Sequence, residues 1–404
     1  MTSNPDLFEL PAHVDPARLF DVDVYAPAGF ETDFHEAWYK LHEANLPELI
    51  WTPRHGGHWM PTRGKLIGEM FADYTRFSNR VGAVPKELGE LLRFIPNNID
   101  PPQHRDYRTL LNSSLSPAAV IRLSGSIRAL AVDLIEGVRE KGRCDFKTAF
   151  AEILPIHIFL NMMDLPLSDA RHLMSIATRV IRPKSVDDAR DAMQAFADYL
   201  IPWIERRRDG SGTDFMTRLV SGRIGDRIVT RQEAIDLCVQ VLLGGLDTVL
   251  NFLCFAMLFM ARHAEHRRLL LDEPGLIPQA VDELLRRFPV LTLGREVRFD
   301  MEYAGVIMKK GDMIALPSPL HGIDALVNEH PLKVDFHRSS SDHSTFGNGP
   351  HRCPGNFLAR TELIITFEEW LARIPHFLVE PGAEITYVGG VVGGMAALPL
   401  VWQV

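Results

Sequence analysis

Apolar positions follow one another almost without interruption in residues 237–261, the most hydrophobic part of the chain. Just before them, Thr230-Arg-Gln-Glu233 has the spacing of a capping box, in which Thr230 is the N-cap and Glu233 reaches back to it. The pattern predicts one helix from Thr230 to about His263, roughly 45–50 Å long at 1.5 Å per residue. A helix of this length would cross the whole molecule.

The same stretch is long enough to span a bilayer. However, Asp247 lies at its centre, close to Gly244 and Gly245. An aspartate at the centre of a spanning helix costs about 2.5–3.5 kcal/mol on insertion scales, and no second apolar stretch of this kind exists. We therefore expect a buried central helix in a protein without a membrane partner.

The remaining pattern alternates between helical and extended segments. Helices are predicted at residues 127–141, 151–163, 187–207 and 277–288, and β-rich portions near 46–63, 299–317 and 376–403, the first being a hairpin around Gly56-Gly57. The predicted fold class is therefore mainly α with small β-sheets (α+β). Because strands from distant stretches would have to associate, we expect a single domain over residues 1–404.

Composition and charge exclude several classes of protein. The chain has 404 residues, of which 46% are hydrophobic, and a net charge of −9, which disfavours a general nucleic-acid binder. Its cysteines, Cys144, Cys238, Cys254 and Cys353, form no CxxC pair, so neither a disulfide framework nor a zinc ribbon is indicated. The first twenty residues lack the basic and apolar regions of a secretory signal. These features predict a cytoplasmic protein.

Cys353 lies in the stretch Phe346-Gly-Asn-Gly-Pro-His-Arg-Cys-Pro-Gly355. Gly347 and Gly349 allow positive-φ turns and a close approach of the backbone to a flat ligand. A helix is predicted to start near Gly355, and its positive end and free amides favour a thiolate. An arbitrary cysteine is more often buried and inert, but a thiolate in such a loop is a good ligand for haem iron.

The run Gly244-Gly245-Leu-Asp247-Thr248 falls in the middle of the long helix. Two glycines there cost roughly 1 kcal/mol each relative to alanine. Either a neighbouring helix packs closely on them, or a flat ligand and dioxygen lie against the bare backbone. In the second case Thr248 bonds the carbonyl of the preceding turn, and Asp247 and Thr248 relay protons. These residues alone leave both interpretations open.

The spacing Phe-Gly-x-Gly-x-x-x-Cys-x-Gly resembles the haem-binding loop of the cytochrome P450 family, and Asp247-Thr248 resembles the family's acid-alcohol pair. Similarity to the bacterial, soluble camphor-hydroxylase branch covers nearly the whole chain, from Phe20-Asp-Val-Asp-Val-Tyr25 to Ala397-Leu-Pro-Leu-Val-Trp402. The resemblance implies a triangular-prism fold with a long central helix over the haem. It also implies a haem-thiolate monooxygenase that uses haem b and O2, with Cys353 as the axial ligand and Asp247 and Thr248 as catalytic residues.

The resemblance assigns roles to further residues. His104, Arg108, Arg295 and His351 match positions that bind the haem propionates, and Gly244, Gly245, Phe346, Gly347 and Gly355 surround the cofactor. Glu283 and Arg286 match a structural ion pair, and Arg182 matches the partner of the catalytic aspartate. The family relationship also implies a monomer that receives electrons from a [2Fe–2S] ferredoxin and its NADH-dependent reductase. Arg105, Arg108 and Arg352 would give the docking face positive charge.

The substrate pocket departs from that of the camphor hydroxylases. Ala83, Leu92, Asn97, Ile181 and Gln240 stand where those enzymes have phenylalanine, tyrosine, threonine, threonine and leucine, while Leu243, Leu291, Val391 and Val392 keep the pocket apolar. Loss of the tyrosine hydroxyl removes discrimination for one oriented ketone, and the small Ala83 adds room. We therefore expect a terpenoid or norisoprenoid substrate rather than camphor.

Three alternatives remain. Asn97 or Gln240 would supply a substitute donor in a true camphor hydroxylase. A peroxygenase would use hydrogen peroxide without a ferredoxin, but the intact Asp247-Thr248 pair argues against this class. A haem-based gas sensor would be expected to carry an output domain, and none is apparent in the sequence.

Overall fold

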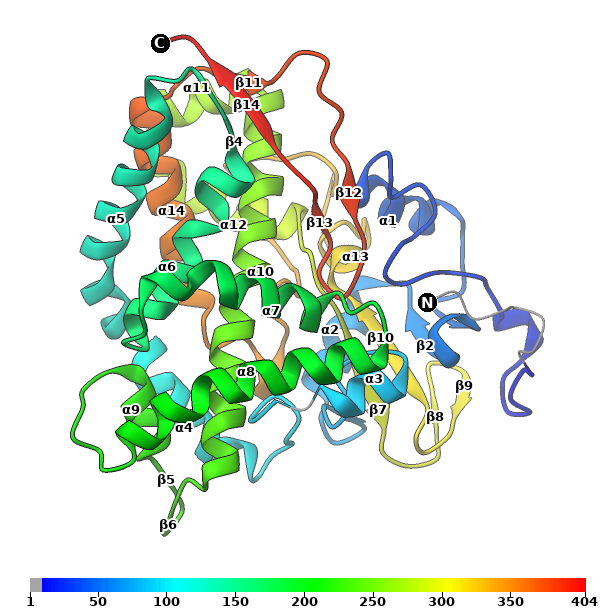
Figure 1. Ribbon diagram of the computed structural model, residues 1–404. Coiled ribbons are helices and arrows are strands. Elements are labelled where there is room, and N and C mark those ends of the chain that lie inside the picture. The colour runs from blue at the N-terminus through cyan, green and yellow to red at the C-terminus, as the bar shows by residue number, and fades with distance from the viewer. Residues whose placement is uncertain (1–8, 93) are drawn as a thin grey trace.

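The computed structural model describes residues 9–92 and 94–404. Its central element is α10 (Arg231–Arg262), which runs through the middle of the molecule (Figure 1). The predicted capping box is confirmed, because the Thr230 hydroxyl accepts from the Glu233 amide and Glu233 Oε2 accepts from the Thr230 amide at 2.8 Å. Among the described residues α10 is the one helix long and apolar enough to cross a bilayer, and 89% of its most apolar window is buried. It is therefore a core helix.

Other helices surround α10, with α7 and α8 crossing it and α5 lying beside α14 (Figure 1). They are α1 (Phe34–Glu43), α2 (Gly64–Ala72), α3 (Lys86–Leu91), α4 (His104–Leu115), α5 (Pro117–Arg139), α6 (Ile153–Met162), α7 (Ala170–Ile181), α8 (Val186–Arg207), α9 (Phe215–Val220), α11 (Ala264–Asp272), α12 (Ile277–Arg287), α13 (Ser318–Gly322) and α14 (Asn356–Arg373). The four predicted helical segments correspond to α5, α6, α8 and α12.

Strands from distant parts of the chain share sheets, as the sequence predicts. The hairpin of β1 (Leu49–Thr52) and β2 (His58–Pro61) pairs in parallel with β10 (Met313–Pro317), and the full order is β1-β2-β10-β7-β3. A second sheet has the order β11-β14-β4. The other strands are β3 (Phe77–Ser78), β4 (Arg143–Asp145), β5 (Arg223–Ile224), β6 (Arg227–Ile228), β7 (Thr292–Val297), β8 (Met301–Tyr303), β9 (Val306–Met308), β11 (Phe377–Val379), β12 (Tyr387–Val388), β13 (Gly394–Met395) and β14 (Pro399–Trp402). The prediction of a mainly helical fold with small sheets is confirmed.

Two helix boundaries differ from the sequence prediction. Helix α5 starts ten residues earlier, because Ser116 caps it and Pro117 occupies its first position. Before α6, residues Lys147–Ala151 form a turn of π-helix, and Pro155 then lies in the first turn of α6. Proline is tolerated there because the amides of a first helical turn have no partner within the helix.

Candidate active site

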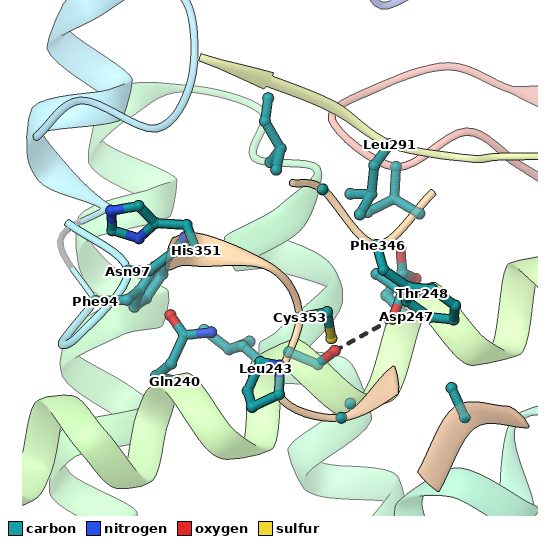
Figure 2. Close-up of a pocket in the computed structure, with 18 of the residues that line it drawn as sticks. Phe94, Asn97, Gln240, Leu243, Asp247, Thr248, Leu291, Phe346, His351 and Cys353 are labelled. Carbon is teal, nitrogen blue, oxygen red and sulfur yellow. Dashed lines mark hydrogen bonds between the residues drawn. The ribbon is translucent and has the colours of Figure 1, made fainter. Parts of the chain in front are cut away.

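A cavity of about 330 Å³ lies between the middle of α10 and the loop that carries Cys353. Asp247 and Thr248 line it from α10, and Cys353 and Phe346 line it from the loop (Figure 2). The structure therefore brings together the two motifs that stand about a hundred residues apart in the sequence.

The loop is closed at its base by a hydrogen bond from the Cys353 amide to the Phe346 carbonyl at 2.8 Å. Gly347 and Gly349 have φ of +64° and +66°, which confirms the predicted positive-φ turns. A Cβ at Gly349 would lie 2.7 Å from the Cα of Ala72, so this glycine also lets the loop pack tightly on α2. The backbone thus holds Cys353 in one position, immediately before α14.

The Cys353 thiol experiences opposing electrostatic effects. Burial raises its pKa, while a hydrogen bond from the Gly355 amide and the nearby charges of Arg108, Arg352 and Arg360 lower it. Burial dominates, so the free thiol is the favoured form until a metal ion binds the sulfur. Pro354 has no amide hydrogen and contributes no such bond.

The structure separates the two glycines of α10. A Cβ at Gly245 would lie 1.9 Å from Phe159 Cε2, so Gly245 is the contact point of α10 with α6. A Cβ at Gly244 would meet only Gln240 Nε2, at 3.1 Å, and Gly244 is exposed toward the cavity. The packing interpretation is therefore confirmed for Gly245, while Gly244 leaves bare backbone at the cavity, where the second interpretation places a ligand.

Thr248 donates to the carbonyl of Gly244 at 3.2 Å, as predicted, and Figure 2 shows both catalytic candidates at the wall of the cavity. Asp247 is 7% exposed, and its Oδ1 accepts from Arg182 Nη1 at 2.9 Å. Arg182 Nη2 donates to the Val392 carbonyl at 2.8 Å, so this arginine joins α7, α10 and the segment before β13. The other carboxylate oxygen, Asp247 Oδ2, is buried and has no hydrogen-bond partner among the residues that the structure describes.

The residues assigned to the propionates gather on one side of the cavity. Arg108, Arg295 and His351 line it, whereas His104 lies behind them with its ring 4.3 Å from that of His351. Arg295 is 3% exposed, has no ion pair with a described carboxylate, and burial lowers its pKa to about 10. A buried guanidinium without an anion is costly.

This side of the cavity therefore suits a cofactor that carries carboxylates. The described residues hold no cluster of three or more His, Cys, Asp or Glu side chains that could bind a metal ion alone. A metal at Cys353 would have to arrive within a larger group, and haem meets both requirements.

Glu283 and Arg286 form the expected pair, with Arg286 Nε and Nη2 each 2.8 Å from a Glu283 oxygen. Arg286 is fully buried and also donates to the carbonyls of Gly322 and Pro331. The sequence did not single out Arg338, whose Nε lies 3.1 Å from Glu283 Oε2. The pair is thus the centre of a network that holds the chain between α13 and the Cys353 loop against α12.

All predicted pocket residues line the cavity, namely Ala83, Leu92, Asn97, Ile181, Gln240, Leu243, Leu291, Val391 and Val392. The sequence missed Glu362, a fully buried residue of α14 that also lines the cavity and whose carboxyl oxygens have no partner among the described residues. Burial raises the pKa of Glu362 to about 8, so it is mainly protonated at neutral pH.

Comparison with known proteins agrees with this geometry. The family model described as "Cytochrome P450" matches residues 139–383. The probable cytochrome P450 127A1 of Sinorhizobium fredii is 32% identical over 403 residues, covering 97% of each chain, and the pentalenic acid synthase of Streptomyces avermitilis is 30% identical over 75% of this chain and 77% of its own.

Two crystal structures are similar over their whole length. CYP101J2 is 42% identical with a TM-score of 0.92, and CYP101C1 is 40% identical with a TM-score of 0.90; each comparison covers 98% of this chain and 100% of the other. The members of this family carry a haem-thiolate cofactor, and the expected relationship to the camphor-hydroxylase (CYP101) branch is confirmed. The chain belongs to the cytochrome P450 family and is a haem-dependent monooxygenase of the CYP101 type.

Proposed function

We propose that this cytochrome P450 hydroxylates a hydrophobic terpenoid or norisoprenoid, with Cys353 as the ligand of the haem iron. The observation that carries the proposal is the cavity that joins Cys353 to Asp247 and Thr248. Bound haem supplies the activation of O2, and the reaction inserts one oxygen atom into a C–H bond while the other leaves as water with two protons and two electrons. Arg108, Arg295 and His351 would hold the propionates, with His104 supporting His351 from behind.

Asp247 and Thr248 are suited to delivering the protons. Arg182 holds one oxygen of the Asp247 carboxylate and leaves Oδ2 without a hydrogen-bond partner among the described residues. A free carboxylate oxygen accepts a proton from water and passes it on. The neighbouring Thr248 hydroxyl, fixed by Gly244, is the next donor toward the reacting centre.

The lining of the cavity favours an apolar substrate larger than camphor. Leu92 offers no hydrogen bond, and the short side chain of Ala83 leaves space where a phenylalanine would fill it. Leu243, Leu291 and Val392 add apolar surface to the same wall and would keep water away from a bound substrate carbon.

Electrons would come from a [2Fe–2S] ferredoxin and its NADH-dependent reductase. Arg108, Arg352 and Arg360 lie close enough to Cys353 for their charges to act on its thiol, and Arg108 donates to the Arg352 carbonyl. Arg105 is exposed on α4, the helix that carries Arg108, so positive charge gathers at the loop despite the acidic total. We propose that the protein works as a cytoplasmic monomer with one domain.

A spectroscopic titration and a turnover assay test this proposal. Terpenoids, norisoprenoids and camphor are titrated into the ferric protein, and the Soret shift that follows loss of the iron-bound water reports binding. Turnover is then compared with ferredoxin, reductase and NADH, or with peroxide alone. Hydroxylation of a terpenoid supported by NADH is expected. Camphor as the only ligand would make the enzyme a camphor hydroxylase, and turnover by peroxide alone would contradict the ferredoxin route.

A further inference from the structure

Gln240 places an unpaired carboxamide in the wall of the substrate cavity. It lies on α10, two turns before Thr248, and its Oε1 is buried without a hydrogen-bond partner among the described residues. A buried amide oxygen without a partner destabilises the free protein. Its presence in the same cavity wall as the apolar Leu243 and Leu291 therefore needs an explanation.

A second carboxamide lies nearby. Asn97, in the segment after α3, lines the same cavity, and its side chain makes no hydrogen bond to a described residue. Figure 2 shows Asn97 and Gln240 together at one side of Cys353, with Asp247 and Thr248 at the other side. The two carboxamides therefore lie on the same side of Cys353 as His351, apart from the residues assigned to proton delivery.

The position of the amide along α10 can be fixed from Gly244. A Cβ at Gly244 would lie 3.1 Å from Gln240 Nε2, so the amide lies over the bare backbone of that glycine. Thr248 follows one turn later, roughly 6 Å along the axis at 1.5 Å per residue. An atom held by the amide is thus about one helical turn from the oxygen-handling pair.

We propose that the Gln240 carboxamide, with Asn97, binds an oxygen function of the substrate and so determines which carbon is oxidised. The amide N–H donates to a carbonyl, or its oxygen accepts from a hydroxyl. The substrate is then an oxygen-bearing terpenoid that is hydroxylated several bonds away from its oxygen. The terpenoid skeleton of the substrate is taken from the proposed function. The hydrogen bond between the Gln240 amide and a substrate oxygen does not depend on that skeleton.

The test compares ligands that differ only at the oxygen. β-Ionone, the corresponding alcohol, and the hydrocarbon in which a methylene group replaces the carbonyl oxygen are titrated into the ferric haem protein, and Kd is read from the Soret shift. One neutral hydrogen bond corresponds to about 3- to 10-fold in Kd. We expect the Kd of the hydrocarbon to be about 3- to 10-fold higher than the Kd of the ketone or of the alcohol, depending on which of the two accepts or donates the bond to the amide.

Two variants assign the effect. In Gln240→Leu the ratio of the hydrocarbon's Kd to the Kd of the preferred oxygen-bearing ligand should fall toward 1, because only the Asn97 amide remains. Leu243→Ala is the matched control on the same helix, since it enlarges the cavity without touching a polar group. It should weaken all ligands alike and leave the ratio unchanged. A ratio near 1 in the wild type, or an unchanged ratio in Gln240→Leu, would overturn the inference.

A measurement without ligand separates this inference from the proposed substrate class. Because the amide bonds to no other described residue, Gln240→Leu should unfold at the same temperature as the wild type or higher. A Tm several degrees lower would show that the amide is structural and would overturn the inference. If none of the three ligands shifts the Soret band, the terpenoid proposal fails, and the Tm still decides whether the amide is free to bind.

Discussion

At Gly245, where α10 contacts α6, we expect the addition of a single carbon atom to lower the stability of the protein. In Gly245→Ala the new Cβ would lie 1.9 Å from Phe159 Cε2 and 2.1 Å from Cζ, and Phe159 is itself buried at 6% exposure. Overpacking of a close-packed core costs typically about 1–3 kcal/mol. Alanine returns about 1 kcal/mol through its higher helix propensity. The net loss in the free energy of unfolding should therefore lie between zero and about 2 kcal/mol.

Gly244→Ala is the matched control, one residue away on the same helix. Its Cβ would meet only the flexible end of Gln240, at 3.1 Å, so the gain in helix propensity should remain and stabilise the protein by up to about 1 kcal/mol. The gain in helix propensity is common to both variants, so they should differ by the overpacking cost alone, roughly 1–3 kcal/mol. Phe159→Leu removes the clashing ring atoms, and in that background Gly245→Ala should cost nothing.

Urea unfolding of the haem-loaded proteins, followed by circular dichroism, measures these differences. The reasoning is refuted if Gly245→Ala is as stable as Gly244→Ala. It is also refuted if Phe159→Leu fails to relieve the effect of Gly245→Ala, because the clash would then lie elsewhere.

Three further predictions concern the surroundings of the haem. Arg286→Lys loses the two-point contact with Glu283 and should lower the free energy of unfolding by about 3 kcal/mol. Arg338→Lys, at the edge of the network, should lower it less, and equal urea midpoints for the two variants would contradict the proposed network. The pKa of Glu362 is about 8 in the folded protein and 4.5 ordinarily, so the folded state holds the proton of this carboxyl more tightly than the unfolded state. The protein is therefore most stable below pH 4.5, where the carboxyl is protonated in both states, and loses stability as the pH rises toward 8. Glu362→Gln stays neutral, and its advantage over the wild type in urea unfolding should therefore grow between pH 5 and 7.5; a constant difference would argue against a protonated Glu362. Pro354→Leu adds an amide hydrogen beside the Cys353 sulfur and should raise the haem reduction potential measured by spectroelectrochemistry, whereas an unchanged potential would contradict this account.

Much of the fold could be predicted from the sequence because capping residues and turn glycines determine the backbone next to them. The capping box at Thr230 and Glu233 fixes the start of α10 within one residue, because both side chains satisfy amides of the first turn. Gly347 and Gly349 take the positive φ angles expected of them. The pocket residues also line one cavity as expected, since the chain aligns with its family over nearly its full length.

The features that were missed depend on contacts between distant segments. The pattern of α10 does not say which of Gly244 and Gly245 meets a neighbouring helix, because that depends on the position of Phe159 in α6. Arg338 looks like an ordinary surface residue until its contact with Glu283 is seen. The Glu362 carboxyl has no hydrogen-bond partner in the described part of the chain, which is likewise a property of the packed structure, and its sequence surroundings give no sign of it.

The ferrous carbon monoxide spectrum tests the central claim, thiolate ligation by Cys353, most directly. In the wild type its Soret band should lie at the long wavelength of a thiolate-ligated haem, and replacing any other cysteine, as in Cys144→Ser, should leave it there. Cys353→His should retain haem and move the band to the shorter wavelength of imidazole ligation. A wild-type band at the imidazole position, or a thiolate-type band that survives Cys353→His, would contradict the assignment of Cys353 as the iron ligand.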